Sequence, residues 1–418
     1  VTLNAGAKTG SGTDGTISIG TSNTSSIALG QDTTLAAGKS LTVTGGNTAS
    51  RPASPTEGMI YFDSTTKQLL VYSNGKWQAD RSAATKIVAA NNSSQAAKDA
   101  ADYVADGTGD QTEINNALTA AAGGRVYLAE GTYVANATIL IPNNTTLAGA
   151  GQGTVVELAD LDATDNLIEN KDSTAGNATP GSGVRIQDMK LDGRKDLNTA
   201  GTQYGVYFSD MGSGTDTSAV AGASITGVTF TRFRNDGLYL TASSNNKISG
   251  NSFRLNGGAG LSVNALSNYN LISNNQSQGN TAEGIINSSS SQNTYSGNNI
   301  QGNGTIGISS LSGSSRNNFS GNTATDNPTA GIKFAGETRS TIVGNTIRGG
   351  GSNQYGIWIT SSSSNNAISA NNVYDTGGAG ATNGIYVNIG SNNNITNNVV
   401  GDSSCNTTCY AVNIDHAS

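Results

Sequence analysis

Apolar and small polar residues alternate on a regular schedule through the second half of the chain. From about residue 225 to 400, an apolar residue followed by a Ser-Gly-Asn-like corner recurs every 23 to 28 residues. Between successive corners stands a glycine followed by Ile or Leu, at Gly237, Gly260, Gly284, Gly307, Gly331, Gly356 and Gly384. A period of this length predicts a stacked solenoid, in which each unit buries its apolar side only against its neighbours.

The length of the repeat predicts three short strands per turn, separated by tight corners, in a three-sided coil of parallel strands. We expect the asparagine of each corner to bond through its side-chain amide to the asparagines of the turns above and below. Asparagine also tolerates left-handed backbone, which suits a bend. We therefore assign a structural ladder, rather than ligand binding, to Asn251, Asn275, Asn298, Asn322, Asn345, Asn371 and Asn398.

The first eighty residues lie outside the repeat. Residues 1–50 carry short alternating strands with few large apolar side chains, so we expect them to pack on a neighbouring subunit or on the rest of the chain. Residues 51–82 differ, because two apolar strands and an Asn-Gly reversal predict a small β-meander. We expect Tyr61 and Trp77 to pack in its small core, with a sugar-stacking platform as the alternative.

Helical patterns occur between residues 83 and 124. The Ala-rich stretch 94–104 predicts one helix. A second is predicted to start at Asp110, because Glu113 follows three residues later in a capping-box pattern. Its apolar stripe ends at Gly123-Gly124. A helix laid over the first turn of a solenoid would cover its open end.

This part of the chain resembles a known family. Residues 106–118 run Asp-Gly-Thr-Gly-Asp-Gln-Thr-Glu-Ile-Asn-Asn-Ala-Leu, and Gly-Arg-Val-Tyr-Leu follows at 124–128. Together with 141–151, they resemble the first turns of pectate-lyase-like right-handed β-helices, which include phage tailspikes and bacterial surface proteins. Over about residues 84–415, the resemblance implies an all-β, right-handed, single-stranded parallel β-helix with a short helical N-terminal cap. It implies no particular activity, because this superfamily holds lyases, hydrolases, epimerases and inert fibres.

Composition and charge exclude some partners. Charged residues make up only 12% of the chain and glycine 55 of its 418 residues, which suits tight turns and side-chain ladders. A net charge of -7 argues against a nucleic-acid partner. No apolar run approaches the length of a membrane-spanning helix, so we expect no membrane span.

The two cysteines, Cys405 and Cys409, are expected to form a small-loop disulfide, with two free thiols as the alternative. The single histidine, His416, leaves no partner for a zinc site, and we expect no metal and no cofactor. A disulfide agrees with an extracellular setting. The chain begins at Val1 rather than Met, so it is either a processed protein or a fragment.

Few carboxylates occur in the regular coil. Polysaccharide cleavage generally needs paired carboxylates, or a calcium cluster with a base. Asp236 and Glu283 each directly precede a repeat glycine, so we expect them in one column, two rungs and about 9.6 Å apart. This separation lies at the upper end of the range for inverting glycosidases, which makes the two a candidate catalytic pair. The alternative is solvated charges on a polar face.

Aromatic residues form a second candidate site for contact with sugars. Tyr207 and Tyr239 stand at the same offset after their glycines, as do Trp358 and Tyr386. Rings on one face can stack against saccharides, and we add Arg194 and Arg234 to this candidate carbohydrate-binding set. Packing in the core or at a subunit interface is the alternative.

The organisation predicted is an assembly segment (1–50), a connector (51–82), a helical cap (83–124), the parallel β-helix (125–404) and a C-terminal end (405–418). The acid-poor coil and the strand-rich N-terminus favour an extracellular structural or adhesive fibre, on a cell or virion surface. We expect it to self-assemble into a filament or a trimer, with polysaccharide as a further partner. The alternatives are a polysaccharide-processing hydrolase, lyase or epimerase, and a passive binding module.

Overall fold

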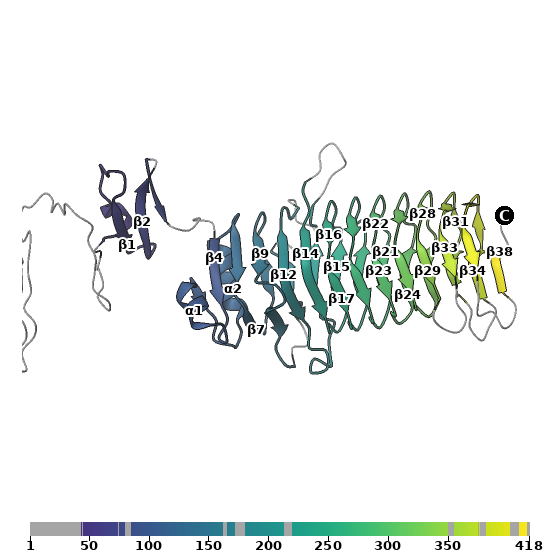
Figure 1. Cartoon of the computed structure of the whole chain (residues 1–418), viewed down its shortest axis with the longest axis horizontal. Coiled ribbons are helices and arrows are strands. Elements are labelled where there is room, and N and C mark those ends of the chain that lie inside the picture. The colour runs from purple at the N-terminus through teal and green to yellow at the C-terminus, as the bar shows by residue number, and fades with distance from the viewer. Residues whose placement is uncertain are drawn as a thin grey trace, which may run out of the picture. The chain divides into compact units, whose positions relative to one another are not determined.

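The computed structural model describes residues 43, 45–73, 75–79, 85–161, 165–171, 180–212, 220–349, 355–374, 376, 382–401 and 409–415. The chain divides into two compact units, Val1–Ser82 and Ala83–Ser418 (Figure 1). The strands predicted within residues 1–42 lie outside the described residues.

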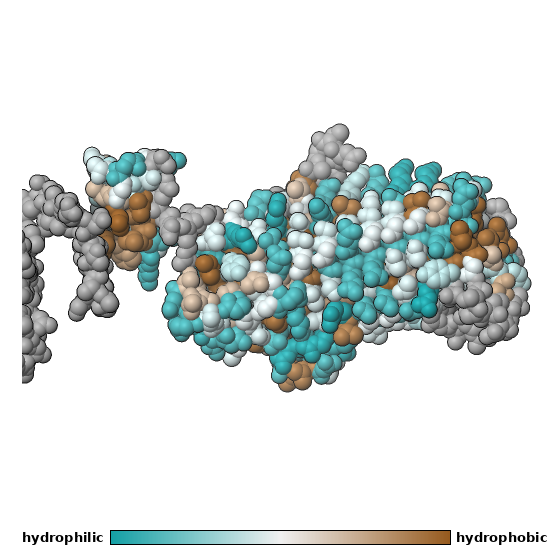
Figure 2. Space-filling model, viewed as in Figure 1, coloured by the Kyte–Doolittle hydropathy of each residue, from teal (hydrophilic) through white to brown (hydrophobic). Residues whose placement is uncertain are grey.

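The first unit is the predicted meander. A short 3-10 helix, η1 (Thr48–Ser50), precedes β1 (Ile60–Asp63), β2 (Gln68–Ser73) and β3 (Lys76–Ala79), which pair antiparallel in that order. One face buries Tyr61 and Leu70, and the Tyr61 ring lies 5.7 Å from that of Trp77. The other face exposes large apolar side chains, and Figure 2 shows apolar atoms gathered on this unit.

The second unit begins with β4 (Thr85–Ala89), β5 (Tyr103–Val104) and two helices. The first helix, α1 (Gln95–Ala100), is shorter than predicted, because the chain turns after it into β5, which pairs with β4. The second, α2 (Gln111–Ala120), starts where predicted and buries its apolar stripe. The capping-box prediction is wrong: the Asp110 carboxylate accepts hydrogen bonds from the Gly107 and Val134 N–H groups instead of capping α2.

The rest of this unit is a coil of parallel strands with three strands in each regular turn (Figure 1). The first stack comprises β4, β6 (Arg125–Leu128), β9 (Thr146–Gly149), β12 (Arg185–Asp192), β14 (Ser224–Thr231), β16 (Lys247–Ser249), β19 (Leu271–Ser273), β22 (Thr294–Ser296), β25 (Asn318–Ser320), β28 (Thr341–Val343), β32 (Ala367–Ser369) and β36 (Asn394–Thr396). The second comprises β7 (Gly131–Ala135), β10 (Thr154–Leu158), the ends of β12 and β14, β17 (Ser252–Arg254), β20 (Gln276–Gln278), β23 (Asn299–Gln301), β26 (Thr323–Thr325), β29 (Thr346–Arg348), β33 (Asn372–Tyr374) and β37 (Val399–Gly401).

The third stack is a separate sheet and carries the candidate site. It comprises β8 (Ile139–Ile141), β11 (Ile168–Asn170), β13 (Val206–Ser209), β15 (Leu238–Thr241), β18 (Leu261–Asn264), β21 (Ile285–Ser288), β24 (Ile306–Leu311), β27 (Ala330–Ala335), β30 (Tyr355–Thr360), β34 (Thr382–Asn388) and β38 (Cys409–Asp415). We call it the third sheet. A short pair, β31 (Ser363–Ser364) and β35 (Gly390–Ser391), lies at a late corner.

Buried aliphatic and aromatic side chains fill the coil, one column per strand. In the third sheet, Ile285, Ile308, Ile332, Ile357 and Ile385 follow one another in register and are buried. The repeat glycine before each of these positions lies against the second stack. A Cβ on Gly331 would meet the Ile347 Cγ2 at 2.3 Å, so only glycine fits there.

The corner asparagines form a continuous hydrogen-bonded column from Asn251 to Asn398. Each side-chain Nδ2 donates to the Oδ1 of the asparagine in the next turn, at 2.9–3.1 Å. Two further asparagine columns, which the sequence analysis missed, run from Asn256 to Asn327 and from Asn246 to Asn317. The corners are therefore held by side chains as well as by backbone bonds.

Candidate functional site

Three tyrosines gather on the outward side of the third sheet. Tyr207 in β13 and Tyr239 in β15 are partners in register, with ring centroids 5.5 Å apart and planes within 4°. Tyr204, in the corner before β13, lies 5.6 Å from the Tyr207 ring and 4.8 Å from the Tyr239 ring. All three side chains are partly exposed. The repeat spacing predicted Tyr207 and Tyr239 as site residues but not Tyr204, which directly precedes Gly205 as Asp236 precedes Gly237.

Asp236 lies beside this tyrosine group and is only 6% exposed. Its carboxylate accepts a hydrogen bond from the Ala259 N–H at 2.7 Å. A Cβ on Gly258 would lie 2.1 Å from Asp236 Oδ1, so the glycine leaves room for the carboxylate. Burial raises the pKa of Asp236 to about 6. Burial, and then the nearby Asp236, raise the pKa of Tyr204 to about 12. Asp236 can therefore hold a proton at mildly acidic pH.

Glu283 stands in the same column as Asp236. The Gly237 N–H donates to the Ala259 carbonyl and the Gly260 N–H to the Glu283 carbonyl, so Ala259 lies between the two acids. Two rungs separate their backbones by about 9.6 Å. Glu283 is partly exposed, and its negative charge contributes to the raised pKa of Asp236.

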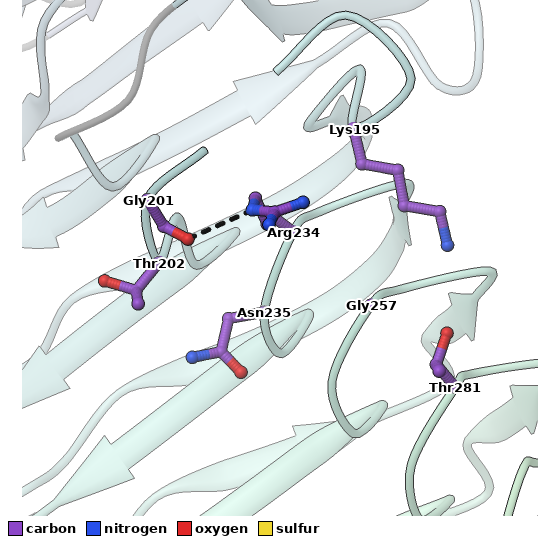
Figure 3. A pocket seen from close by; sticks show the side chains of 7 residues that line it. All are labelled: Lys195, Gly201, Thr202, Arg234, Asn235, Gly257 and Thr281. Carbon is purple, nitrogen blue, oxygen red and sulfur yellow. Dashed lines mark hydrogen bonds between the residues drawn. The ribbon is translucent and has the colours of Figure 1, made fainter. Parts of the chain in front are cut away.

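A cavity of about 460 Å³ lies at the corner beside this site (Figure 3). It is lined by Lys195, Gly201, Thr202, Arg234, Asn235, Gly257 and Thr281. Arg234 donates from Nε to the Gly201 carbonyl at 3.2 Å, and the Lys195 and Arg234 side chains both project from its walls in Figure 3. No carboxylate lines the cavity, and within the described ranges neither cation forms an ion pair. Sequence reasoning missed Lys195, which stands in a loop outside the repeat.

Arg194 belongs to a different cluster. It pairs with Glu157 at 3.3 Å and Asp160 at 2.8 Å, at the ends of β10 and β12. Asp192, which is buried in the same cluster, accepts from both Arg232 Nε and Arg232 Nη2. The structure therefore places Arg234 on the wall of the cavity but engages Arg194 in ion pairs of the second stack.

Trp358 and Tyr386 lie on the same outward column of the third sheet as Tyr207 and Tyr239, several turns further along. They are joined by Tyr355 and Lys333, neither of which was selected from the sequence.

The described part of the chain contains no group of three or more His, Cys, Asp and Glu side chains arranged to hold a metal. Asp375, His416 and Cys405 lie outside the described residues, so the disulfide between Cys405 and Cys409 stays a prediction. Of the helices in the described ranges, none has the length and apolar character needed to cross a membrane.

Comparison with known proteins agrees with this architecture. The family model of the right-handed β-helix region matches residues 198–347 and 307–418, which together exceed half of the chain. No curated protein sequence matches significantly.

Two solved structures of low sequence identity share the fold. The A-module of mannuronan C-5 epimerase AlgE4 from Azotobacter vinelandii has 18% identity and a TM-score of 0.55, over 75% of this chain and 95% of that chain. The A-module of AlgE6 from the same organism has 16% identity and a TM-score of 0.50, over 74% and 96%. The Dettilon tailspike protein has 14% identity and a TM-score of 0.45, over 73% and 67%.

Proposed function

Because this chain belongs to the right-handed β-helix family, whose fold serves both enzymes and inert fibres, we propose a function from the site: it binds an acidic polysaccharide on the third sheet. The observation that carries this proposal is a cavity with two cations, Lys195 and Arg234, that form no ion pair with a described residue; its wall includes Thr202, two residues before Tyr204. Tyrosine rings provide apolar area for sugar rings. Lys195 and Arg234 provide charge for a carboxylate or sulfate on the same ligand.

Two features support this ligand class. The protein carries a net charge of -7, yet the two cations at the cavity have no ion-pair partner among the described residues, while Arg194 and Arg232 are paired nearby. The two structural neighbours with the higher TM-scores are named as epimerases of mannuronan, a polymer of acidic sugars. Because their sequence identity is low, these neighbours are evidence for the fold only. The evidence for an acidic ligand is the positive charge of the cavity.

The test is binding to mannuronan and polygalacturonate, with dextran as the neutral comparison, measured by calorimetry at low and high salt. We expect both acidic polymers to bind and dextran to fail. Changing Lys195→Gln and Arg234→Gln together should lower affinity by about tenfold or more, since charged hydrogen bonds contribute about 1.5–3 kcal/mol each. Arg254→Gln, at an exposed position of the second stack, is the matched control. Equal binding of dextran, or an unchanged affinity in the double variant, would contradict the proposal.

Asp236 supports a second candidate function, the chemical processing of the bound chain. A buried carboxylic acid with a pKa of about 6 beside tyrosines can act as a general acid. Incubation with each polymer, followed by assays for reducing ends, for unsaturated sugars and for epimerised residues by NMR, tests this directly. Loss of product with Asp236→Asn, at unchanged affinity, is the expected result for an enzyme. A protein that binds but yields no product in any assay is a binding module.

The self-assembling extracellular fibre predicted from the sequence depends on residues 1–50, which lie mostly outside the described residues. Negative-stain microscopy of the full chain distinguishes filaments, trimers and monomers. Monomers at high protein concentration would contradict the fibre.

A further inference from the structure

A second aromatic group lies on the third sheet near its C-terminal end. The Tyr355 and Tyr386 rings stack with centroids 5.0 Å apart and planes within 14°, and the Trp358 ring lies 4.9 Å from Tyr355. Lys333 Nζ stands 4.1 Å from the centre of the Trp358 ring. Like the first site, this group therefore combines three aromatic rings with a cation that has no carboxylate partner among the described residues.

These rings lie on the outer surface of the coil. The side chains that alternate with them, Ile332, Ile357 and Ile385, are buried and fill the interior. Lys333, Tyr355, Trp358 and Tyr386 are all partly exposed. Packing of the hydrophobic core therefore does not require aromatic residues at these positions.

The two groups share one column of the sheet. Tyr239 is followed in register by Ser262, Ile286, Ser309, Lys333 and Trp358. Five rungs separate Tyr239 from Trp358, which is about 24 Å along the coil axis at the spacing of neighbouring strands. The three positions between the groups carry no aromatic residue and no charge, so bulky rings and cations are confined to the two ends.

We propose that Lys333, Tyr355, Trp358 and Tyr386 form a second saccharide-binding subsite, and that one polysaccharide chain lies along the third sheet and occupies both groups. This inference rests on the proposed function. A rigid polymer bound parallel to the axis meets rings at both ends, and each cation meets an acidic group of the polymer. Because the two subsites are joined by one ligand, a long chain binds more tightly than a fragment that reaches only one of them.

Tryptophan fluorescence tests this inference, since Trp77 and Trp358 are the two tryptophans of the chain. In the full-length Trp77→Phe variant, the emission reports on Trp358 alone. The probes are a trisaccharide and a decasaccharide of mannuronate. We expect saturable changes of emission with both, and an affinity at least about tenfold higher for the decasaccharide, since the second contact is intramolecular.

Substitutions at each end separate the two subsites. Lys333→Gln should lower the affinity for both probes measured at Trp358, while Tyr239→Ala should lower that for the decasaccharide alone. Lys247→Gln, an exposed lysine on the first stack, is the control and should change neither.

The outcomes separate this inference from the proposed function. One outcome is that calorimetry shows binding of the decasaccharide and a lower affinity in Tyr239→Ala. If Trp358 emission then stays constant on binding and Lys333→Gln leaves the affinity unchanged, the second subsite is overturned and the first site stands. If the probes change Trp358 emission but their affinity is unchanged by Tyr239→Ala and Arg234→Gln, the second subsite binds sugar alone and the first site is overturned. If no mannuronate probe changes Trp358 emission, the second subsite is overturned.

Discussion

Tyr207 and Tyr239 stack one rung apart, with ring centroids 5.5 Å apart and planes within 4°. Both rings belong to the outward column of the third sheet, and Tyr204 closes the group from the preceding corner. Cross-strand aromatic pairs stabilise a sheet, but they also present a flat apolar surface with a polar rim. Burial is the larger cause of the raised pKa of the Tyr204 hydroxyl, and Asp236 lies near enough to raise it further.

Replacing Tyr239 by alanine should reduce affinity for acidic polysaccharide by about two- to tenfold, because an aromatic contact contributes about 0.5–1.5 kcal/mol beyond the area it covers. Tyr239→Phe keeps the ring and should retain the affinity. Calorimetry with both variants separates the ring from the hydroxyl. A Phe variant as weak as the Ala variant would show that the hydroxyl group, and not stacking, carries the contact.

Asp236 should make the protein less stable as pH rises. Its pKa is raised from 3.8 to about 6 by burial, so the folded state binds the proton more tightly than the unfolded state. The stabilisation from this proton is present below about pH 4 and is lost as pH rises to about 6. Asp236→Asn should therefore raise the free energy of unfolding above pH 6, by up to about 3 kcal/mol.

Urea denaturation followed by circular dichroism, at several pH values between 4 and 8, measures this effect. The free energy of unfolding of Asp236→Asn should nearly equal that of the wild type at the acidic end, and should exceed it increasingly as pH rises towards 6. Asp99→Asn, on the exposed surface of α1, is the control for a carboxylate of the same type. If the free energy of unfolding differs between wild type and Asp236→Asn by the same amount at every pH, Asp236 is not the group that binds the proton.

The sequence predicted the coil because the same physical constraint returns in every turn. A buried aliphatic residue, a corner asparagine and a glycine recur together, and the structure uses them as the core, the ladder and the close approach of two stacks. The helix α2 was predictable because its apolar stripe is local. The role of Asp110 was not, because its partner Val134 belongs to a strand 24 residues later.

The candidate site was only half predictable. Tyr207, Tyr239 and Asp236 follow the repeat, so their columns could be read from spacing. Lys195 lies in the irregular loop after β12, and no period relates it to Arg234. The pairing of Arg194 with Glu157 and Asp160 depends on two strands meeting in register, which the sequence alone does not specify.

A second pH-dependent group is Glu337, which is fully buried inside the coil. Its carboxylate accepts hydrogen bonds from Ser310, Ser340 and, at 2.9 Å, Asn317 Nδ2. Burial raises its pKa although these three bonds oppose the rise. As for Asp236, the folded state holds the proton more tightly, so the stability from Glu337 is lost as pH rises through its raised pKa.

Glu337→Gln should therefore raise the urea midpoint at pH 8 and leave it nearly unchanged at pH 4, because the amide stays neutral. Glu337→Ala should lower the midpoint at both pH values. It leaves three buried donors without their acceptor, at a cost of about 1–3 kcal/mol for each group. Equal losses for Gln and Ala at pH 8 would show that the carboxylate charge itself is stabilising.

Gly331→Ala should lower the free energy of unfolding by about 1–3 kcal/mol, since the added methyl would meet the buried Ile347 Cγ2 at 2.3 Å. Gly401→Ala is the matched control, because a Cβ at that position meets nothing within 4 Å. Thermal denaturation of both variants makes the comparison. If the two variants lose equal stability, the repeat glycine is not required by packing.

Asn322→Ala should destabilise the middle of the coil more than the same change at the end of the ladder. Asn322 Nδ2 donates to Asn345 Oδ1 at 3.0 Å and to the Tyr295 carbonyl at 2.9 Å, and its Oδ1 accepts from the N–H and Nδ2 of Asn298. Removing it leaves buried groups on both neighbouring turns unsatisfied, so we expect a loss of about 2–5 kcal/mol. Asn398 is partly exposed and ends the ladder, so Asn398→Ala should cost about 1 kcal/mol.

Hydrogen exchange of the backbone amides locates the effect of Asn322→Ala, because a solenoid opens locally between neighbouring turns. Faster exchange should be confined to the turns that hold Asn298, Asn322 and Asn345, while β13 and β15 keep their protection. Faster exchange spread evenly over the whole coil would contradict a local role for the ladder. It would show instead that the coil opens as one cooperative unit, in which every turn shares the loss of one asparagine.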